Sequence, residues 1–420
     1  MAFKQRYLHF YGLNEAIHLA FLAWAWTYLS GGSVSLTLAA YAAFYVLNVA
    51  VMMAILLIRR LFRRSRAVRK TVALPDNIHP LPDFDVFYHT TRDGVKLRVM
   101  CTEPKTPLKR KATGGFDATS LKKTQKAKRN SKPVMLLALP LGQNGQDIFN
   151  PVFAHYGDEF VYITWDYRGF FSSSSPPTLR RMSIANHAMD AREVLNACGY
   201  DFAHVMIGHS MGTTVAFETV LLYPDAVGSL VILNGFHGHV FQTAFQPLVR
   251  LPFSSDCVGA LIEFLLAHPN LLDKLRRMLA PVLGATLPMY AKVFGSSLMK
   301  SLHGDTYLLD FFNSYMGTIY TNLRNTKSWL RMFQELDAHS VYHLLPTIKQ
   351  PVLLISGLLD TITPPLQSVE CARRIPHAVH YCDPTSTHAS ILESPEWCVA
   401  EIDVFLGDVL NGDDDDKKER

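Results

Sequence analysis

Cysteine is scarce in this chain: six residues among 420, widely separated, with no Cys-x-x-Cys pair. Scattered cysteines at this density do not build a disulfide scaffold, and the lack of the paired motif excludes a zinc knuckle or a thioredoxin-like redox site. Apolar residues nevertheless make up 49% of the chain and aromatic residues 11%. This is too much apolar material for a disordered protein, so the chain is able to bury a sizeable core.

Negative charge is nearly missing from two basic stretches. Residues 59–70 hold seven positive charges and no negative one, and residues 105–132 hold ten positive charges against one negative charge, Asp117. A nucleic-acid-binding protein usually spreads its basic residues over a folded face, so we expect no nucleic-acid partner. The Lys-, Thr- and Ser-rich residues 104–132 lack hydrophobic periodicity and predict a disordered basic insertion. Such an insertion either has no role or adds a weak attraction to anionic lipid.

Charge of either sign is absent from residues 16–58, a run of 43 positions. About 20 residues span a bilayer, so the run has room for two segments, and the Gly-Gly-Ser at 31–33 divides it. The arginines that follow favour the cytoplasmic side. We predict a membrane anchor over residues 1–70, a hairpin of one or two transmembrane helices that leaves the bulk of the chain in the cytosol. The alternative is a buried hairpin of a soluble fold.

Residues 411–420 form a charged tail that ends in Lys417-Lys418-Glu419-Arg420. This ending resembles the dilysine retrieval signal of endoplasmic-reticulum membrane proteins, which acts only at a cytosolic C-terminus. The alternative is a solvated tail without a signal. We therefore expect an integral membrane protein of the endoplasmic reticulum whose folded part faces the cytosol.

Apolar runs alternate with helical patterns from residue 83 to residue 410. Residues 83–88 and 95–101, joined through Arg92-Asp93-Gly94, predict a β-hairpin. Buried strands are predicted at 134–139, 161–165, 204–207, 229–233 and 352–355, and helices at 187–197 and 213–222. The alternation predicts an α/β fold with a mostly parallel sheet and helices on both faces.

The clearest chemical motif is Gly208-His209-Ser210-Met211-Gly212, directly after a strand pattern and directly before a helix pattern. In this context G-x-S-x-G predicts a nucleophile elbow, a strained turn that exposes the serine at a helix N-terminus. The glycines two positions away leave room for the strand and helix to approach. Ser210 is therefore the candidate nucleophile, with the backbone N–H of Met211 as a candidate oxyanion donor.

The partners that a serine nucleophile needs occur later in the chain. Asp360 ends a short loop after the strand pattern at 352–355, and His388 follows a short strand predicted around 379–382. A hydroxyl needs a base to take its proton and an acid to orient that base. We assign His388 as the proton shuttle and Asp360 as the acid that fixes its tautomer.

These motifs together resemble the α/β-hydrolase superfamily of lipases, esterases and thioesterases, whose triad runs in the chain order Ser, Asp, His. The resemblance also includes Asp166-Tyr167-Arg168-Gly169 after a core strand. It implies an α/β-hydrolase core in two parts, residues 83–235 and 346–410, and it implies no metal and no organic cofactor.

Two departures from the family pattern affect the site. Relatives commonly carry His-Gly after the third strand, whereas this chain has Pro140, which has no N–H. The resemblance then makes Leu141 the second oxyanion donor beside Met211. Gly142 and the bulky Phe171, which stands where relatives have a small residue, are expected to line the substrate pocket.

Residues 236–345 separate the two parts of the core and are too long for one crossover. Their apolar helical patterns, at 258–266, 271–279 and 307–315, predict a lid over Ser210. An apolar lid on a membrane-tethered protein favours a serine hydrolase that cleaves a lipid ester: an acylglycerol, a sterol ester or a lysophospholipid. The alternatives are a lipid acyltransferase with the same triad and a catalytically silent membrane scaffold. The oligomeric state is left open.

Overall fold

The computed structural model describes residues 79–105, 132–143, 147–243, 254–279 and 322–415, with scattered positions between residues 20 and 44 and at 310 and 313. Four predicted features lie wholly or almost wholly outside the described residues: the membrane anchor (1–70), the basic insertion (104–132), the helix at 307–315 and the dilysine ending (417–420). Among the residues that are described, no helix is both long and apolar enough to cross a bilayer.

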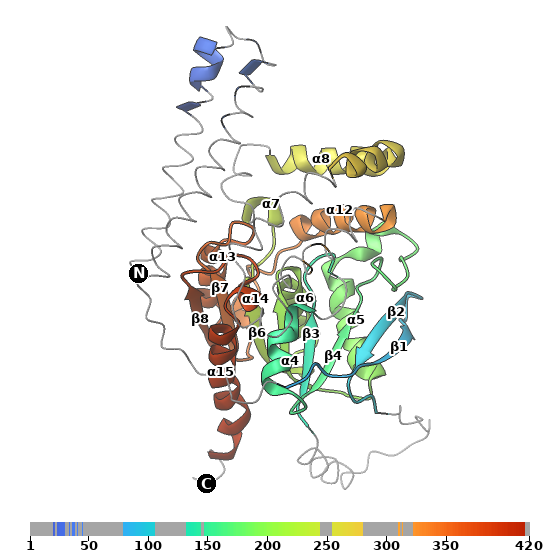
Figure 1. Ribbon diagram of the computed structural model, residues 1–420, viewed down its shortest axis with the longest axis vertical. Coiled ribbons are helices and arrows are strands. Elements are labelled where there is room, and N and C mark those ends of the chain that lie inside the picture. The colour runs from blue at the N-terminus through green and yellow to red at the C-terminus, as the bar shows by residue number, and fades with distance from the viewer. Residues whose placement is uncertain are drawn as a thin grey trace.

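An eight-stranded sheet forms the centre of the fold (Figure 1). Its spatial order is β1-β2-β4-β3-β5-β6-β7-β8. The strands are β1 (Asp85–Thr90), β2 (Lys96–Cys101), β3 (Val134–Ala138), β4 (Val161–Trp165), β5 (Ala203–His209), β6 (Val227–Leu233), β7 (Val352–Gly357) and β8 (Ala378–Asp383). β2 runs antiparallel to both of its neighbours, β1 and β4, and the six strands β3 to β8 are parallel to one another. The predicted mostly parallel sheet is therefore confirmed.

The N-terminal hairpin is also confirmed. β1 and β2 pair antiparallel with Asp85 opposite Cys101 and Thr90 opposite Lys96. Gly94 takes a positive φ of 85° in the turn between them, a conformation that glycine adopts without steric cost. The first strand begins at Asp85, two residues later than the pattern placed it.

Helices cover both faces of the sheet, which is why β3, β4 and β7 are buried along their whole length. Helix α4 (Asn150–Tyr156) contacts α15 (Pro395–Asp415), and α5 (Ile184–Ala197) contacts α6 (Met211–Leu222). Because the crossovers between parallel strands are right-handed, these two pairs lie on opposite faces. Helix α15 continues to Asp415, so it takes in five residues that the sequence pattern assigned to the charged tail.

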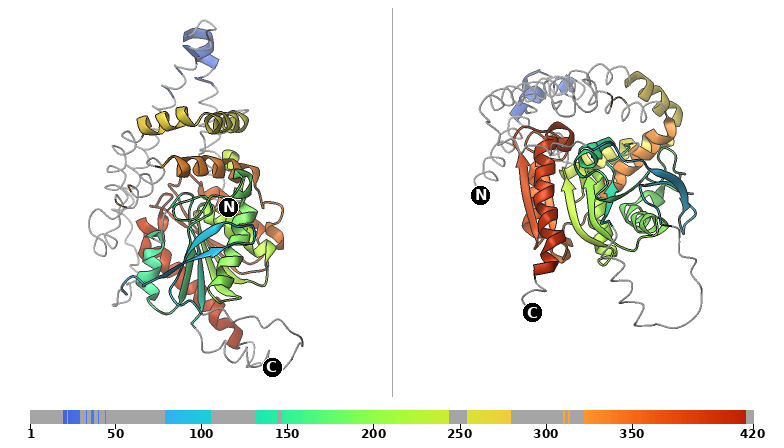
Figure 2. Two further views of the ribbon diagram at one scale, coloured as in Figure 1. Left: turned by 90° about the vertical axis from the view of Figure 1, so that its right-hand side faces the viewer. Right: turned by 60° about the horizontal axis from the view of Figure 1, so that its bottom comes forward.

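Most of the described residues between 236 and 345 are helical, as predicted, and these helices stand beyond the carboxyl ends of the parallel strands (Figures 1 and 2). They are α7 (Val240–Thr243), α8 (Ser254–Ala267), further helical residues at 269–279, and α12 (Leu323–Ala338). Helix α12 contacts both α7 and α8. The role of these helices as a lid stays a prediction.

The remaining elements are short or join the later strands. They are α13 (Pro365–Arg374), α14 (Ser390–Glu393), the 3₁₀ turns η2 (Asp147–Phe149), η3 (Leu179–Met182) and η4 (Leu345–Thr347), and the π-helical turn η1 (Ala25–Leu29). Helix α13 packs on β7 and β8, so it extends the face that α5 and α6 cover.

Candidate active site

Ser210 lies on a tight turn between β5 and α6. Its φ of 53° and ψ of −118° are outside the regions that non-glycine residues ordinarily occupy. Its backbone N–H donates to the carbonyl of Leu233 at 3.0 Å, and its own carbonyl accepts from the N–H of Thr213 at 2.9 Å. The turn is thus fixed from both sides, and the side chain stands at the N-terminus of a 12-residue helix.

The two glycines of the motif are required by close backbone approaches. A Cβ on Gly208 would lie 2.4 Å from the carbonyl oxygen of Gly212, and a Cβ on Gly212 would lie 2.1 Å from the carbonyl oxygen of Ala138. Such distances are far inside van der Waals contact. Only glycine at these positions lets α6 pack against the ends of β5 and β3, which is what the motif predicted.

The structure brings the three candidate triad residues together. His388 Nε2 lies 2.9 Å from Ser210 Oγ, and His388 Nδ1 lies 2.9 Å from Asp360 Oδ2. Asp360 is buried, whereas the His388 side chain keeps 18% of its surface exposed. A hydroxyl, an imidazole and a buried carboxylate in this linear order form the charge arrangement that activates a serine.

Several donors surround the carboxylate of Asp360. The backbone N–H groups of Ile362 and Thr363 donate to Oδ1 at 2.8 and 2.9 Å. The Thr363 hydroxyl and the Asn234 amide lie 2.8 and 2.9 Å from Oδ2. Burial acts to raise the pKa of Asp360, but the adjacent His388 and these donors outweigh it and hold the pKa below its ordinary value. Asp360 is therefore ionised at neutral pH.

The loop that carries His388 is fastened to the acid loop. A Cβ on Gly357 would lie 2.3 Å from the carbonyl oxygen of Thr387, so β7 ends directly against this loop. The N–H of Leu359 donates to Ser386 O at 2.9 Å. Buried Glu393 accepts from the N–H and the hydroxyl of Thr387, both at 2.5 Å. The position of the imidazole is thus set by its own backbone.

His209 supports the same loop from the nucleophile side. Its Nε2–H donates to the carbonyl of His388 at 2.8 Å, which fixes the neutral tautomer with the proton on Nε2. Burial, followed by the neighbouring His388, lowers the pKa of His209 to about 3. His209 therefore stays neutral and acts as a structural donor beside the nucleophile.

The candidate oxyanion donors lie on both sides of Ser210. Leu141 follows β3, which pairs with β5 through Ala138 and Gly208, and Met211 opens α6. Both residues are buried. Within the described part of the chain, neither backbone N–H makes a hydrogen bond. Two unpaired N–H groups beside a nucleophile suit an oxyanion that forms during reaction.

The two candidate pocket residues, Gly142 and Phe171, differ in burial and in contacts. Gly142 has a positive φ of 72°, as the sharp bend after Leu141 requires. Phe171 is half-buried in the loop after β4 with a φ of 45°, and its carbonyl accepts from the Arg324 guanidinium of α12. Phe171 therefore links the sheet edge to the helices beyond it.

The Asp-Tyr-Arg-Gly motif supports the fold around the site. Arg168 is buried and donates to Asp190 Oδ2 at 2.7 Å and to Asp93 Oδ2 at 2.9 Å. Asp93 lies in the hairpin turn and Asp190 on α5, so the Arg168 guanidinium, from the loop after β4, ties the hairpin turn to α5. Removing one member of such a buried group would leave a buried charge without a partner and destabilise the fold.

Sequence reasoning did not assign roles to Asn234, Thr363 or His209. Asn234 directly follows β6, and its side-chain amide holds the acid in place. His209 sits inside the motif but contacts a residue 179 positions away. A local motif contains no signal for such contacts.

Comparisons with known proteins agree with this geometry. A family model described as "alpha/beta hydrolase fold" matches residues 139–395, more than half of the chain. A protein of Shigella flexneri serotype 5b (strain 8401), named "Putative carbamate hydrolase RutD", is 24% identical over 268 residues, which cover 63% of this chain and 87% of the relative.

Solved structures show the same fold. Esterase EaEST from Exiguobacterium antarcticum is 17% identical, with a TM-score of 0.51 and coverage of 76% of this chain and 98% of that one. A thermophilic esterase from Thermogutta terrifontis, with malate bound, is 19% identical, with a TM-score of 0.51 and coverage of 78% and 99%. At these identities the likeness shows the fold alone.

Proposed function

The chain belongs to the α/β-hydrolase fold family, and from the contacts of Ser210 we propose that it is a serine esterase. The observation that carries this proposal is the pair of 2.9 Å contacts from His388 to Ser210 and to Asp360. Family membership makes the chain a hydrolase, and the triad supplies a nucleophile, a base and an acid for acyl transfer.

The reaction follows from the geometry. Ser210 Oγ attacks the ester carbonyl carbon while its proton passes to His388 Nε2, and ionised Asp360 stabilises the imidazolium. The N–H groups of Leu141 and Met211 stabilise the oxyanion. The C–O bond to the alcohol then breaks, and His388 returns its proton to the leaving oxygen. Water attacks the acyl-serine with His388 as base, which releases the acid and restores Ser210.

The substrate class we propose is a lipid ester: an acylglycerol, a sterol ester or a lysophospholipid. The support is a group of exposed large apolar side chains on the helices beyond the sheet edge: Leu261, Phe264, Leu271, Met278 and Leu279. Such groups are typical of surfaces that meet lipid or a partner. The uncharged run at 16–58 adds to this support. Carbamates belong in the substrate panel because the Shigella relative is named for them.

The test is labelling with a fluorophosphonate, which phosphonylates activated serines. We expect labelling of the wild type, none of Ser210→Ala, and unchanged labelling of the control Ser172→Ala, an exposed serine in the loop after β4. Ester turnover by Ser210→Ala should fall by a factor on the order of 10⁶, as for other serine triads. Labelling that persists in Ser210→Ala contradicts the proposal, as does an unlabelled wild type with detergent present.

The location is a separate proposal: the endoplasmic-reticulum membrane, with the hydrolase domain in the cytosol. Its support is the basic run at 59–70 after an uncharged segment, together with Lys417 and Lys418 near the C-terminus. An N-terminally tagged protein should remain in the membrane pellet after carbonate extraction, and one lacking residues 1–70 should not. Replacing both lysines by serine should move the protein out of the endoplasmic reticulum; an unchanged distribution removes that part of the proposal.

A further inference from the structure

The hydroxyl oxygen of Thr363 lies within hydrogen-bond distance of three groups at once. This oxygen, Oγ1, is 2.8 Å from Asp360 Oδ2, 2.8 Å from Asn234 O and 3.0 Å from His388 Nδ1. Thr363, Asp360 and Asn234 are buried, each with at most 1% of its surface exposed. The hydroxyl therefore touches both the acid and the base of the triad, and its hydrogen-bonding pattern decides how it acts on them.

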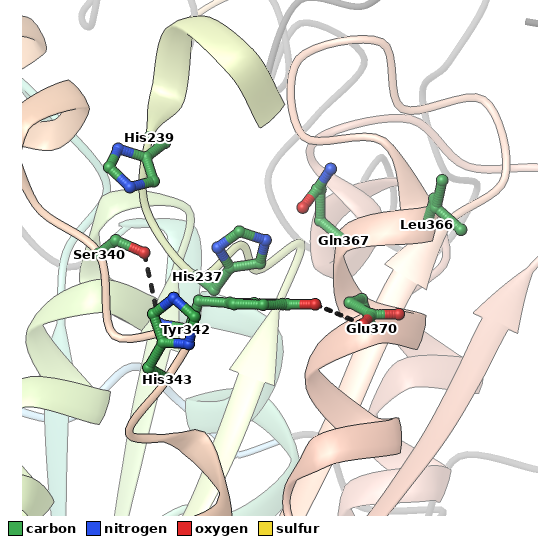
Figure 3. A pocket seen from close by; sticks show the side chains of 8 residues that line it. All are labelled: His237, His239, Ser340, Tyr342, His343, Leu366, Gln367 and Glu370. Carbon is green, nitrogen blue, oxygen red and sulfur yellow. Dashed lines mark hydrogen bonds between the residues drawn. The ribbon is translucent and has the colours of Figure 1, made fainter.

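Contacts other than the imidazole hold Thr363 in this position. Its own N–H donates to Asp360 Oδ1 at 2.9 Å. Helix α13 begins two residues later, and Ser368 Oγ on its first turn donates to Gly235 O, next to Asn234, at 3.1 Å. Figure 3 shows the first turns of α13 facing the stretch after β6 across a cavity of about 300 Å³, which no triad residue lines. The hydroxyl is thus placed independently of the base.

The hydrogen on the imidazole faces Thr363 as well as Asp360. His388 Nε2 lies 2.9 Å from Ser210 Oγ and has to take up its proton, so the neutral ring carries its own hydrogen on Nδ1. Two oxygens, Asp360 Oδ2 and Thr363 Oγ1, lie within 3.0 Å of Nδ1 and 2.8 Å from each other. One hydrogen between two acceptors makes a three-centre hydrogen bond. A ring held by a single acceptor pivots about that bond, whereas two acceptors fix its plane.

The hydrogen on the Thr363 hydroxyl has a better partner than the carboxylate. Asp360 already accepts from four other groups: the N–H groups of Ile362 and Thr363, the Asn234 amide and the imidazole. The main-chain carbonyl of Asn234 has no other donor among the described residues, and a buried carbonyl without a donor destabilises the fold. A hydroxyl has one hydrogen and two lone pairs. With its hydrogen on that carbonyl, Oγ1 keeps a lone pair for the imidazole.

This second acceptor becomes more important during the reaction. As Ser210 attacks, His388 takes up a proton and becomes an imidazolium, and hydrogen bonds from a charged donor are about twice as strong as neutral ones. Asp360 and Thr363 then share the stronger Nδ1 donor. The hydroxyl therefore stabilises the charged form of the base more than the neutral form.

The other titratable groups near the base do not contact the Thr363 hydroxyl. The His209 ring lies 5.1 Å from the His388 ring, and burial lowers the pKa of His209 to about 3, so it stays neutral. Buried Glu393 contacts the N–H and the hydroxyl of Thr387. Changing the side chain at position 363 therefore leaves these groups as they are.

We propose that Thr363 is a positioning residue of the triad, whose hydroxyl accepts the Nδ1 hydrogen of His388 together with Asp360 and so fixes the plane of the base. The inference rests on the proposed esterase function and adds a residue to its machinery. A hydroxyl that merely donated to Asp360 would act in the opposite sense. Loss of an acceptor weakens the imidazolium, whereas loss of a donor would make the carboxylate a stronger partner for it.

The test measures the rate of Ser210 labelling by a fluorophosphonate over the pH range in which an imidazole titrates. Thr363→Val removes the hydroxyl and keeps the shape, and Thr363→Ser keeps the hydroxyl. Thr363→Ala is a second variant without the hydroxyl, for use if the valine protein does not fold. The control is Thr219→Val, which removes a buried hydroxyl that donates to Val215 O at 2.7 Å further along α6. Thermal midpoints check folding in every variant.

We expect Thr363→Val to slow labelling about threefold to tenfold, the effect of one hydrogen bond, and to move the acidic limb of the profile to lower pH. Thr363→Ser should keep the wild-type rate and limb, and Thr219→Val should change stability alone. A wild-type rate in Thr363→Val, an acidic limb that stays or moves to higher pH, or a serine variant as slow as the valine variant overturns the inference. A wild type that is not labelled overturns the esterase proposal instead.

Discussion

Asn234 donates its side-chain amide to the same oxygen of Asp360 that faces His388, and both distances are 2.9 Å. The amide also donates to Thr387 O at 3.0 Å, one residue before the catalytic imidazole. Its own oxygen accepts from Ser390 Oγ at 2.5 Å. A single buried carboxamide thus connects the acid to the backbone of the loop that carries the base.

Replacing Asn234 by alanine should lower kcat by about 10- to 100-fold, because a hydrogen bond to a charged group contributes about 1.5–3 kcal/mol. Replacing it by aspartate places a second carboxylate beside Asp360, and the repulsion should raise the apparent pKa of the pair. The acidic limb of the kcat profile should then move to higher pH. Steady-state kinetics across pH check both effects, and an alanine variant with full kcat contradicts the assignment.

Asp360→Asn should lower kcat by a factor on the order of 10⁴ with little change in KM, because the amide favours the wrong tautomer of His388. The backbone donors of Ile362 and Thr363 still find an acceptor in the asparagine oxygen, so the fold should persist. Fluorophosphonate labelling rates and ester hydrolysis measure the loss. A variant that retains wild-type kcat shows that another group orients His388.

Stability should fall between pH 6.5 and pH 4 because of histidines that are buried in the neutral form. Burial lowers the pKa of His209 to about 3 and that of His380 to about 4, from an ordinary value of 6.5. Between the folded and unfolded pKa values only the unfolded chain binds the proton, so the stabilisation is complete above pH 6.5 and is lost as the pH falls. Each such group contributes a slope of about 1.4 kcal/mol per pH unit.

His209→Gln keeps a donor for His388 O and removes one titrating group. The slope of unfolding free energy against pH should then be shallower by roughly the contribution of one histidine. Urea unfolding from pH 4 to pH 7 measures both proteins. Parallel curves for variant and wild type would mean that His209 is protonated in the folded state as well.

Gln143 lies two residues after Leu141 and is buried, yet neither polar atom of its side chain has a hydrogen-bond partner in the described chain. Burying an unsatisfied amide costs about 1–3 kcal/mol. Gln143→Leu should therefore raise the free energy of unfolding by a similar amount, measured by urea denaturation. A less stable variant shows that the amide is already satisfied in the folded protein.

The candidate site could be predicted from the sequence where its residues form a short, continuous motif. The elbow requires a strand, a turn and a helix within a few residues, so Ser210 and its glycines follow from one pattern. Asp360 and His388 could be predicted because each follows a later predicted strand, in the chain order Ser, Asp, His. Asn234 contacts Asp360 across 126 positions, and that contact depends on which loops meet at the sheet edge. Periodic sequence patterns do not predict a contact between two such loops.

The fold was predictable for a related reason. Buried parallel strands are continuous apolar runs, and β3, β4 and β7 appear where such runs occur. Helix α15 extends into residues that the sequence analysis assigned to the charged tail, because the acidic residues after Asn411 do not by themselves stop a helix. The cavity between residues 237–239, residues 340–343 and the first turns of α13 was not predictable, since these three segments share no motif.

The basic insertion begins and ends on the edge of the sheet opposite to the triad. Lys105 N–H donates to Cys198 O at the end of α5, and Lys132 pairs with Glu103 at 2.6 Å, just before β3 begins. Ser210, Asp360 and His388 instead follow the carboxyl ends of β5, β7 and β8. Residues 106–131 are therefore the place to splice a fluorescent reporter or a tether for immobilisation, with the reactive edge left facing away from the attachment.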